Sequence, residues 1–517
     1  MRSRRAAFFG SFLLLGLAAA ACVPYRPFTL PRDVRAQLPP AEQAKYRDSI
    51  RACSDRLDAA YQSLSADMCS FAVVEFDDQG ELFSPKQLDD TLALIGKTSS
   101  RDPQNPGNDR AALVVIFVHG WKNNASPQNE AERNLGSFKK VLAQLAMAEQ
   151  FRGADPSLRR RPVIGVYLSW PGRTINTPVI DNFTFFGRKN AAERVARVAF
   201  SHAIQRIVSS VKGNKSQTRG NPDSVMAVVG HSFGGLIVEN TLLRTLTIET
   251  DDFREFAADL AVLVNPANEA ILARQFVQAL KGAPPHKLEI EGKAVSQPLI
   301  VSVTSVGDGA TGTVFPLAMY LKSGTKRVRT YGKYGDTQPG IRKQRFYYTH
   351  TPGHSTEPAE LYSHDLTCPF SGNPDCGGAD MSSEEYEAKM MAMAKDLLAG
   401  RKTIFPPPAV ELGECRRPEE TRKGVACIER LSFMGPATGE IYTMDRSEDG
   451  YNDTGYWIME MPVSIVPDHS EIFQSELASL LAAFINLKDG KKVSSLEEAK
   501  SYLESHTATA EGVAAGQ

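Results

Sequence analysis

The sequence lacks several features that would indicate particular classes of protein. Its 517 residues carry a formal net charge of −1, and no long block of like charges appears, so no broad positive field is present to attract nucleic acid. No internal repeat is visible either. Its seven cysteines include no C-x2-C pair and no Cys/His cluster of the kind that holds zinc. We therefore expect no nucleic-acid partner and no metal.

The chain also lacks an apolar run long enough for an ordinary membrane span. The run "AAFFGSFLLLGLAAAA" has 16 residues (6–21), and the basic "MRSRR" precedes it, as in an export signal over residues 1–21. "LAAAAC" (17–22) resembles a bacterial lipobox, which implies that Cys22 is acylated and anchors the exported protein to a membrane, the outer one if the cell has it, because Val23 follows. Two alternatives stay open: a soluble periplasmic or secreted protein cut at an A-x-A site, and a retained N-terminal anchor.

Export changes the interpretation of the remaining six cysteines, because thiols pair in an oxidising compartment. The six allow 15 pairings, but they fall into three close sequence pairs, so bridges between nearest neighbours are the simplest hypothesis. The disulfide candidates are Cys53, Cys69, Cys368, Cys376, Cys415 and Cys427.

Strand and helix patterns alternate along most of the chain. Apolar strands are expected at 111–120, 162–170, 225–229, 259–267, 298–311 and 456–466. Helical patterns lie near 129–150, 188–212, 236–243 and 470–486, and a further helix is expected to end at about 281. This alternation predicts an α/β fold: a mostly parallel sheet with helices on both faces, an N-terminal extension and a large insertion before the last strand.

The same patterns divide the chain into successive regions. After the signal peptide (1–21) we expect an N-terminal stalk and helical extension (22–69), a core (70–310), an insertion that is a lid or docking region (311–455), the end of the core (456–490) and a C-terminal tail (491–517).

The segment "VMAVVGHSFGGLIVENTLL" (225–243) places Ser232 at a G-x-S-x-G turn between a strand and a helix. Such a turn holds its central residue in strained backbone geometry and pushes the hydroxyl out above the sheet edge. Glycines at 230, 234 and 235 remove the Cβ atoms that would collide where strand and helix nearly touch. We therefore predict that Ser232 is a nucleophile, the alternative being a glycine-rich turn without chemistry.

Four segments in order, "VIFVHGWKNNAS", "VVGHSFGG", "TSVGDGAT" and "VPDHSEIF", resemble the α/β-hydrolase family, in a bacterial branch with an HGW loop. The resemblance covers roughly 70–310 and 455–490. It implies hydrolysis of an ester, thioester or amide, most readily a carboxylic ester of a small or lipid-like acyl substrate, by a Ser/Asp/His triad without any cofactor.

The fold implied by this resemblance assigns the other site residues. The oxyanion hole would use the backbone N–H groups of Trp121 and Phe233, and His119 and His231 would brace the loops. Asp308 follows a late strand and is the candidate acid, with Glu269 as the alternative.

Chain order selects the base, because the fold requires the order Ser, Asp, His. His469 alone among nine histidines follows the last apolar strand and precedes the terminal helix, so we predict the triad Ser232, Asp308, His469, with His364 as the next candidate base.

Two remaining polar motifs lack the residues or geometry of a metal site. His350 and His354 are separated by Pro352, which prevents the helical geometry of a metal site, and "DRSEDGYNDTGY" (445–456) has Tyr456 where a calcium loop needs glutamate. The competing function is a catalytically idle, membrane-anchored binding or scaffold protein that keeps the hydrolase fold.

Overall fold

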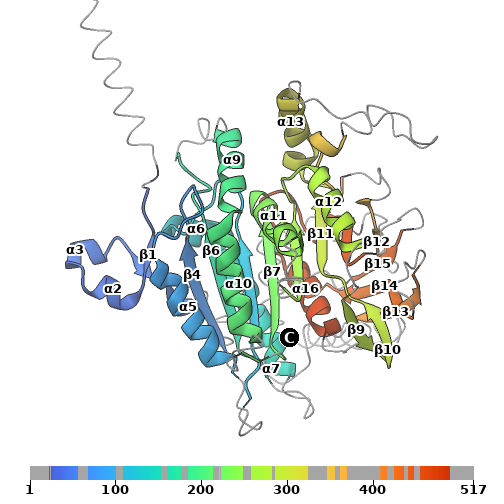
Figure 1. Ribbon diagram of the computed structural model, residues 1–517, viewed down its shortest axis with the longest axis horizontal. Coiled ribbons are helices and arrows are strands. Elements are labelled where there is room, and N and C mark those ends of the chain that lie inside the picture. Colours follow the sequence, from blue (N-terminus) through green and yellow to red (C-terminus); the bar gives the residue numbers. More distant parts are fainter. Residues whose placement is uncertain are drawn as a thin grey trace, which may run out of the picture.

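A computed structural model describes most of the chain (Figure 1). The described residues are 23, 25–55, 68–100, 109–152, 160–175, 184–213, 220–221, 223–247, 258–281, 286–323, 346–354, 361–368, 376, 408–415, 424–435, 440–447 and 454–488. The expected signal peptide, Cys22 and the expected tail at 491–517 lie outside them.

The centre of the molecule is an eight-stranded sheet with the order β16-β11-β8-β7-β5-β6-β4-β3. Every neighbouring pair is parallel except β3 and β4, so the expected mostly parallel sheet is confirmed. The apolar strands in its middle are buried on both faces, as parallel sheets require. Its strands are β3 (Ile50–Ala52), β4 (Cys69–Glu75), β5 (Leu113–Val118), β6 (Val163–Ser169), β7 (Val225–His231), β8 (Leu260–Val264), β11 (Ile300–Ser305) and β16 (Tyr456–Met461).

Helices cover both faces of this sheet, which confirms an α/β architecture (Figure 1). One face packs against α5 (Pro85–Thr98), α9 (Phe185–Val195), α10 (Val198–Lys212), α11 (Phe233–Thr247) and α12 (Ala270–Lys281). The other packs against α6 (Pro127–Glu132), α7 (Asn134–Arg152) and α16 (Ser475–Lys488). The single helix expected near 188–212 is thus two helices, α9 and α10.

A second sheet of six strands packs against α16 (Figure 1). Its order is β12-β15-β14-β10-β9, with β13 also paired to β14. Two of its strands come from the region expected to be core and the rest from the expected insertion, so the insertion shares a hydrophobic core with the main sheet. The strands are β9 (Lys287–Ile290), β10 (Lys293–Ser296), β12 (His364–Thr367), β13 (Ala409–Glu414), β14 (Ala426–Met434) and β15 (Ile441–Arg446).

The N-terminal segment differs from the expected stalk and helical extension. Its elements are β1 (Thr29–Leu30), α2 (Arg32–Ala36), α3 (Pro40–Gln43), β2 (Arg47–Asp48) and β3, so residues 47–48 and 50–52 are strands rather than helix. β2 pairs with β1 and β3 with β4, and these tertiary pairings override the local helical pattern. Buried Glu75 accepts hydrogen bonds from the backbone of Phe28 and Thr29, which holds the segment against the core.

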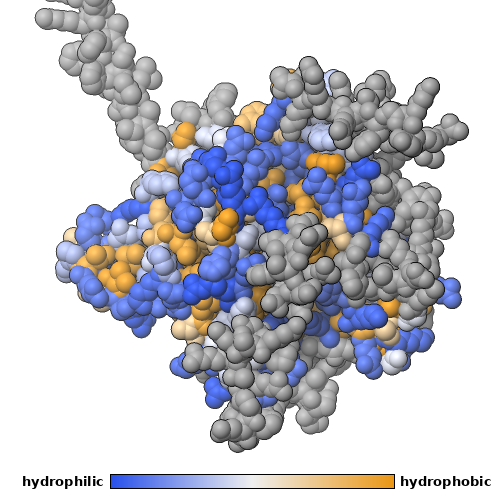
Figure 2. Space-filling model, viewed as in Figure 1, coloured by the Kyte–Doolittle hydropathy of each residue, from blue (hydrophilic) through white to orange (hydrophobic). Residues whose placement is uncertain are grey.

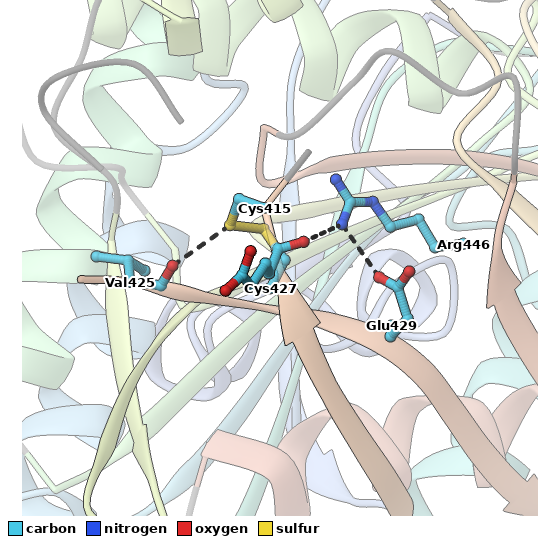
Figure 3. Close-up of a disulfide and its surroundings, with 6 residues drawn as sticks. Cys415, Val425, Cys427, Glu429 and Arg446 are labelled. Carbon is cyan, nitrogen blue, oxygen red and sulfur yellow. Dashed lines mark hydrogen bonds and ion pairs between the residues drawn. A yellow bond between two sulfur atoms is a disulfide. The ribbon is translucent and has the colours of Figure 1, made fainter. Parts of the chain in front are cut away.

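Three disulfides join the cysteines that are nearest in sequence, as predicted: Cys53–Cys69, Cys368–Cys376 and Cys415–Cys427. The last ties β13 to β14, and Arg446 lies beside it with an ion pair to Glu429 (Figure 3). Disulfides persist in oxidising compartments, so they indicate an extracytoplasmic location. In the described part of the chain, no helix has the length and apolar character needed to cross a membrane.

Candidate active site

Ser232 occupies the turn between β7 and α11. β7 ends at His231 and α11 begins at Phe233, so the serine is the single residue between a buried strand and a helix. Its φ of 55° is in the left-handed region that non-glycine residues rarely adopt. Gly234 is required here because a Cβ on it would lie 2.0 Å from the carbonyl oxygen of Val118 on β5. The sequence pattern and the strained turn therefore coincide.

His469 and Asp308 lie in line with this serine. The Nε2 atom of His469 is 2.9 Å from the Ser232 Oγ atom, and its Nδ1 atom is 2.8 Å from Oδ2 of Asp308. Ser232 and Asp308 are buried, and the imidazole of His469 is partly exposed. The three residues follow β7, β11 and β16 at the carboxyl edge of the sheet. The structure thus brings the sequence-predicted triad residues together.

The Asp308 carboxylate is held by several donors. Its Oδ1 accepts the backbone N–H groups of Ala310 and Thr311, and its Oδ2 accepts the Thr311 hydroxyl at 2.5 Å. Burial raises the pKa of this carboxyl, but the hydrogen bonds and charge of His469 and the Thr311 contacts outweigh it and lower the pKa to about 2. Asp308 is therefore ionised at neutral and mildly acidic pH.

Thr311 links the acid to a residue of the expected insertion. The Thr311 Oγ1 atom is 2.7 Å from Nε2 of His354, and because its hydroxyl proton is donated to Asp308, it accepts the hydrogen bond from the imidazole. Sequence reasoning missed both contributions. A local signal could have found Thr311, because it lies three residues after Asp308, near the start of η3 (Ala310–Val314). Nothing in the sequence placed His354 here.

His231 holds the loop that carries the base. Its Nε2–H donates to the carbonyl oxygen of His469 at 2.6 Å, and its Nδ1 accepts a hydrogen bond from the amide of Asn134 at 3.1 Å. Burial and the neighbouring His469 lower the pKa of His231 to about 3, so it is neutral with the proton on Nε2. The residue acts as a loop brace, which is the role that the sequence assigned to it.

Asn265 and Ser305 also hold the loop that carries His469. Asn265 directly follows β8 and has a φ of 46°. Its side-chain N–H donates to the carbonyl oxygen of Asp468, and its side-chain oxygen accepts the N–H of Ser305. The Ser305 hydroxyl donates to the carbonyl oxygen of Val466. These contacts tie the ends of β8 and β11 to the loop preceding His469. Sequence analysis did not single out either residue.

The two residues expected to stabilise an oxyanion both lie near Ser232. Phe233 is the first residue of α11, where a backbone N–H has no acceptor within the helix. Gly120 lies against the serine, because a Cβ on it would be 2.6 Å from the Ser232 Cβ, and Trp121 follows it directly. The Trp121 ring contacts those of Phe185 and Phe233, with centroids 5.4 and 6.4 Å apart.

His119 connects the turn at Gly120 and Trp121 to the residue that follows β6. Its Nδ1–H donates to the carbonyl oxygen of Gly120 at 2.9 Å, and its Nε2 accepts the backbone N–H of Trp170. Burial lowers the pKa of His119 to about 4, so the imidazole is neutral.

The alternative acid and base lie elsewhere. Glu269 pairs with Lys189 at 2.9 Å. His364, on β12 of the second sheet, stacks on Trp457 of β16, with ring centroids 3.9 Å apart. His350 stacks on Phe346. In the residues that the structure covers, no three His, Cys, Asp or Glu side chains gather so as to hold a metal ion.

Comparison of the chain with protein-family models, with curated proteins and with solved structures found no match.

Proposed function

We propose that the protein is an exported serine hydrolase of the α/β-hydrolase fold that cleaves a carboxylic ester, with thioesters and amides as related substrates. The observation that carries the proposal is the hydrogen-bonded chain Ser232–His469–Asp308. The strand–turn–helix setting of Ser232 and the order of the three residues along the chain support it, because both are features of this fold.

The chemistry follows from the positions of the donors. As the Ser232 Oγ atom attacks the substrate carbonyl, its proton passes to Nε2 of His469, while Asp308 holds the Nδ1–H and stabilises the imidazolium. The oxyanion accepts hydrogen bonds from the backbone N–H groups of Phe233 and Trp121.

His469 then gives the proton to the leaving alcohol, and an acyl-enzyme remains on Ser232. Water attacks this ester, with His469 again accepting a proton, and the acid product leaves as the Ser232 hydroxyl is restored. Two easier steps replace one difficult displacement, which is the purpose of a covalent intermediate.

The location proposed with this activity is the cell envelope. The disulfides indicate an oxidising compartment, and the lipobox-like "LAAAAC" supports acylation of Cys22 and a membrane anchor, in the outer membrane where there is one. Mass spectrometry of the mature N-terminus tests this part separately, because an unmodified N-terminus would exclude the anchor.

The activity is tested by fluorophosphonate labelling, followed by turnover of p-nitrophenyl esters of graded chain length. We expect labelling at Ser232 and, in Ser232→Ala, loss of label and a fall in kcat on the order of a million-fold. Ser470→Ala is the matched control, an exposed serine one residue from His469, and should keep the native rate. If the native protein neither takes up the label nor hydrolyses any of the esters, the proposed activity is wrong and the alternative of a binding or scaffold protein is favoured.

A further inference from the structure

The large apolar side chains that remain exposed are distributed unevenly over the molecule. Nine are exposed in the described part of the chain: Tyr25, Phe186, Val198, Val306, Val314, Leu317, Tyr320, Leu321 and Val463. All but Val198 lie at the carboxyl edge of the main sheet, the edge that carries Ser232. The face seen in Figure 2 is otherwise largely hydrophilic, with hydrophobic residues in separate patches.

The helix α13 (Phe315–Ser323) explains most of this asymmetry. It follows the turn of Asp308 through η3, and in the view of Figure 1 it stands at one end of the molecule. Phe315 and Met319 point to the core and are buried. On the other side, Leu317 is 62% exposed and Leu321, one turn further, is 72% exposed. A helix that is apolar on both sides normally has both sides covered, and among the described residues no element buries Leu317 and Leu321.

The start of α9 extends this surface. Phe185 contacts Phe315 with ring centroids 6.2 Å apart, and the Lys322 ammonium lies 5.9 Å from the ring of exposed Phe186. We call the exposed side chains of Phe186, Val314, Leu317, Tyr320 and Leu321, which lie on or beside these two helices, the α9–α13 face.

The described chain begins at the same edge of the sheet. The backbone N–H of Val23 donates to the carbonyl oxygen of Thr174, in the segment that follows β6, and Tyr25 packs on Phe83, in the segment that follows β4. Residue 22 is bonded directly to Val23, so an acyl chain on Cys22 would begin within one residue of this edge.

We propose that the α9–α13 face docks on a lipid bilayer and that Ser232 thereby works at the membrane surface. The inference concerns a surface rather than the reaction, and it makes use of the acylation proposed above for Cys22. Exposed leucine, tyrosine and phenylalanine beside a lysine are the side chains that enter the boundary between headgroups and acyl chains. A bilayer at the carboxyl edge of the sheet would cover the exposed side of α13. It would also lie at the edge where the described chain begins, next to residue 22.

The test is flotation with vesicles of phosphatidylethanolamine and phosphatidylglycerol. The mature-length chain, residues 22–517 with Cys22→Ser, removes the acyl chain and leaves the face as the source of binding. We expect it to float, Leu321→Ser to lower the partition coefficient about tenfold, and Leu317→Ser with Leu321→Ser to lower it to background, because each leucine loses its transfer into the bilayer. Val198→Ser is the matched control, 80% exposed on α10, and should stay within about twofold.

Three outcomes separate the possibilities. Failure of the Cys22→Ser chain to float, or equal flotation of the leucine variants, would overturn the proposal. A native dimer in sedimentation that the leucine variants convert to monomer would also overturn it, since a second copy would then cover the face. Ser232→Ala keeps the face and should float like its parent, so loss of the proposed reaction is distinguishable from loss of docking. Circular dichroism checks that each variant is folded.

Discussion

Four hydrogen bonds converge on Asp308, and they define what this residue contributes. Two come from backbone N–H groups, one from the Thr311 hydroxyl and one from the imidazole of His469. Backbone donors require a carboxylate oxygen or another acceptor at their position, and only an ionised carboxylate accepts all four. At the scale of single residues, the site is therefore organised around a charge that does not titrate near neutral pH.

Replacing that charge provides the first prediction. Asp308→Asn should lower kcat for ester hydrolysis by about four orders of magnitude, because the amide no longer stabilises the imidazolium or selects its tautomer. The measurement is kcat on a p-nitrophenyl ester, with the unfolding temperature recorded in parallel. Glu269→Gln is the control, since Glu269 pairs with Lys189 away from His469, and it should retain most of the rate. Full activity of Asp308→Asn with loss of activity in Glu269→Gln would reverse the assignment of the acid.

A second prediction concerns His231 and acid stability. Its pKa is about 3 in the folded protein because of burial, while an unfolded histidine titrates near its model value of 6.5. The unfolded state thus takes up this proton first, so stability is full above pH of about 6.5 and falls as the pH drops toward 3. At pH 5 the loss from this residue is about 2 kcal/mol.

The measurement is urea unfolding of the native protein and of His231→Gln at pH 7.5 and pH 5. The glutamine does not titrate, so the difference between the two pH values should be smaller in the variant by about 2 kcal/mol. An identical pH dependence in both proteins would show that His231 is not the neutral buried group described here.

At the scale of elements, the buried carboxylate of Glu130 links two N-terminal strands to the helices of the core. Glu130 on α6 pairs with Arg47 on β2, with Arg51 on β3 at 2.8 Å and with Lys139 on α7 at 2.9 Å. Burial raises the pKa of Glu130, but Arg51 and Lys139 outweigh it and lower the pKa to about 2. Burial lowers the pKa of Lys139, and contact with the Glu130 carboxylate opposes that shift.

Glu130→Gln should therefore be strongly destabilising. It removes the carboxylate that the three cations share, and removing one partner of a buried ion pair costs about 3–5 kcal/mol. The measurement is the free energy of unfolding in urea at pH 7.5. Glu42→Gln, which loses only an exposed pair with Lys45, should change it by less than about 1 kcal/mol. Equal effects of the two substitutions would rule out Glu130 as the connection.

At the scale of the whole molecule, disulfides join neighbouring strands in both sheets. Cys53–Cys69 joins the end of β3 to the start of β4, and Cys415–Cys427 joins two strands of the second sheet. Cys53 and Cys69 are also part of the hydrophobic core. The fold is therefore adapted to a compartment in which these bonds persist.

The double variant Cys415→Ala, Cys427→Ala should lower the free energy of unfolding by about 2–4 kcal/mol, because the unfolded chain regains the freedom of the open loop. Urea unfolding measures the change. Addition of a thiol reductant should destabilise the native chain more than the variant, which has one bond fewer to lose. Native protein whose unfolding does not respond to the reductant would show that the disulfides contribute nothing to stability.

The sequence by itself determined the architecture and the three principal residues of the candidate site. Buried parallel strands appear as short runs of β-branched apolar residues, and their carboxyl ends meet at one edge of the sheet, so Ser232, Asp308 and His469 could be placed together from local patterns. The disulfide pairing was accessible for a similar reason, because the partners are 16, 8 and 12 residues apart.

Only the tertiary structure decided how the site is supported and what surrounds it. His354 reaches Thr311 from 43 positions away, Asn134 reaches His231 from 97, and Asn265 reaches the loop of His469 from 203. These contacts join polar residues of loops, where the sequence has no helix or strand periodicity to indicate a partner. Tertiary packing, rather than local propensity, selects the partners. Packing also decides the second sheet, because β10 pairs with β14 across more than a hundred residues. The same holds for α13, which is apolar on both sides, so that only the packing of one side determines which side is exposed.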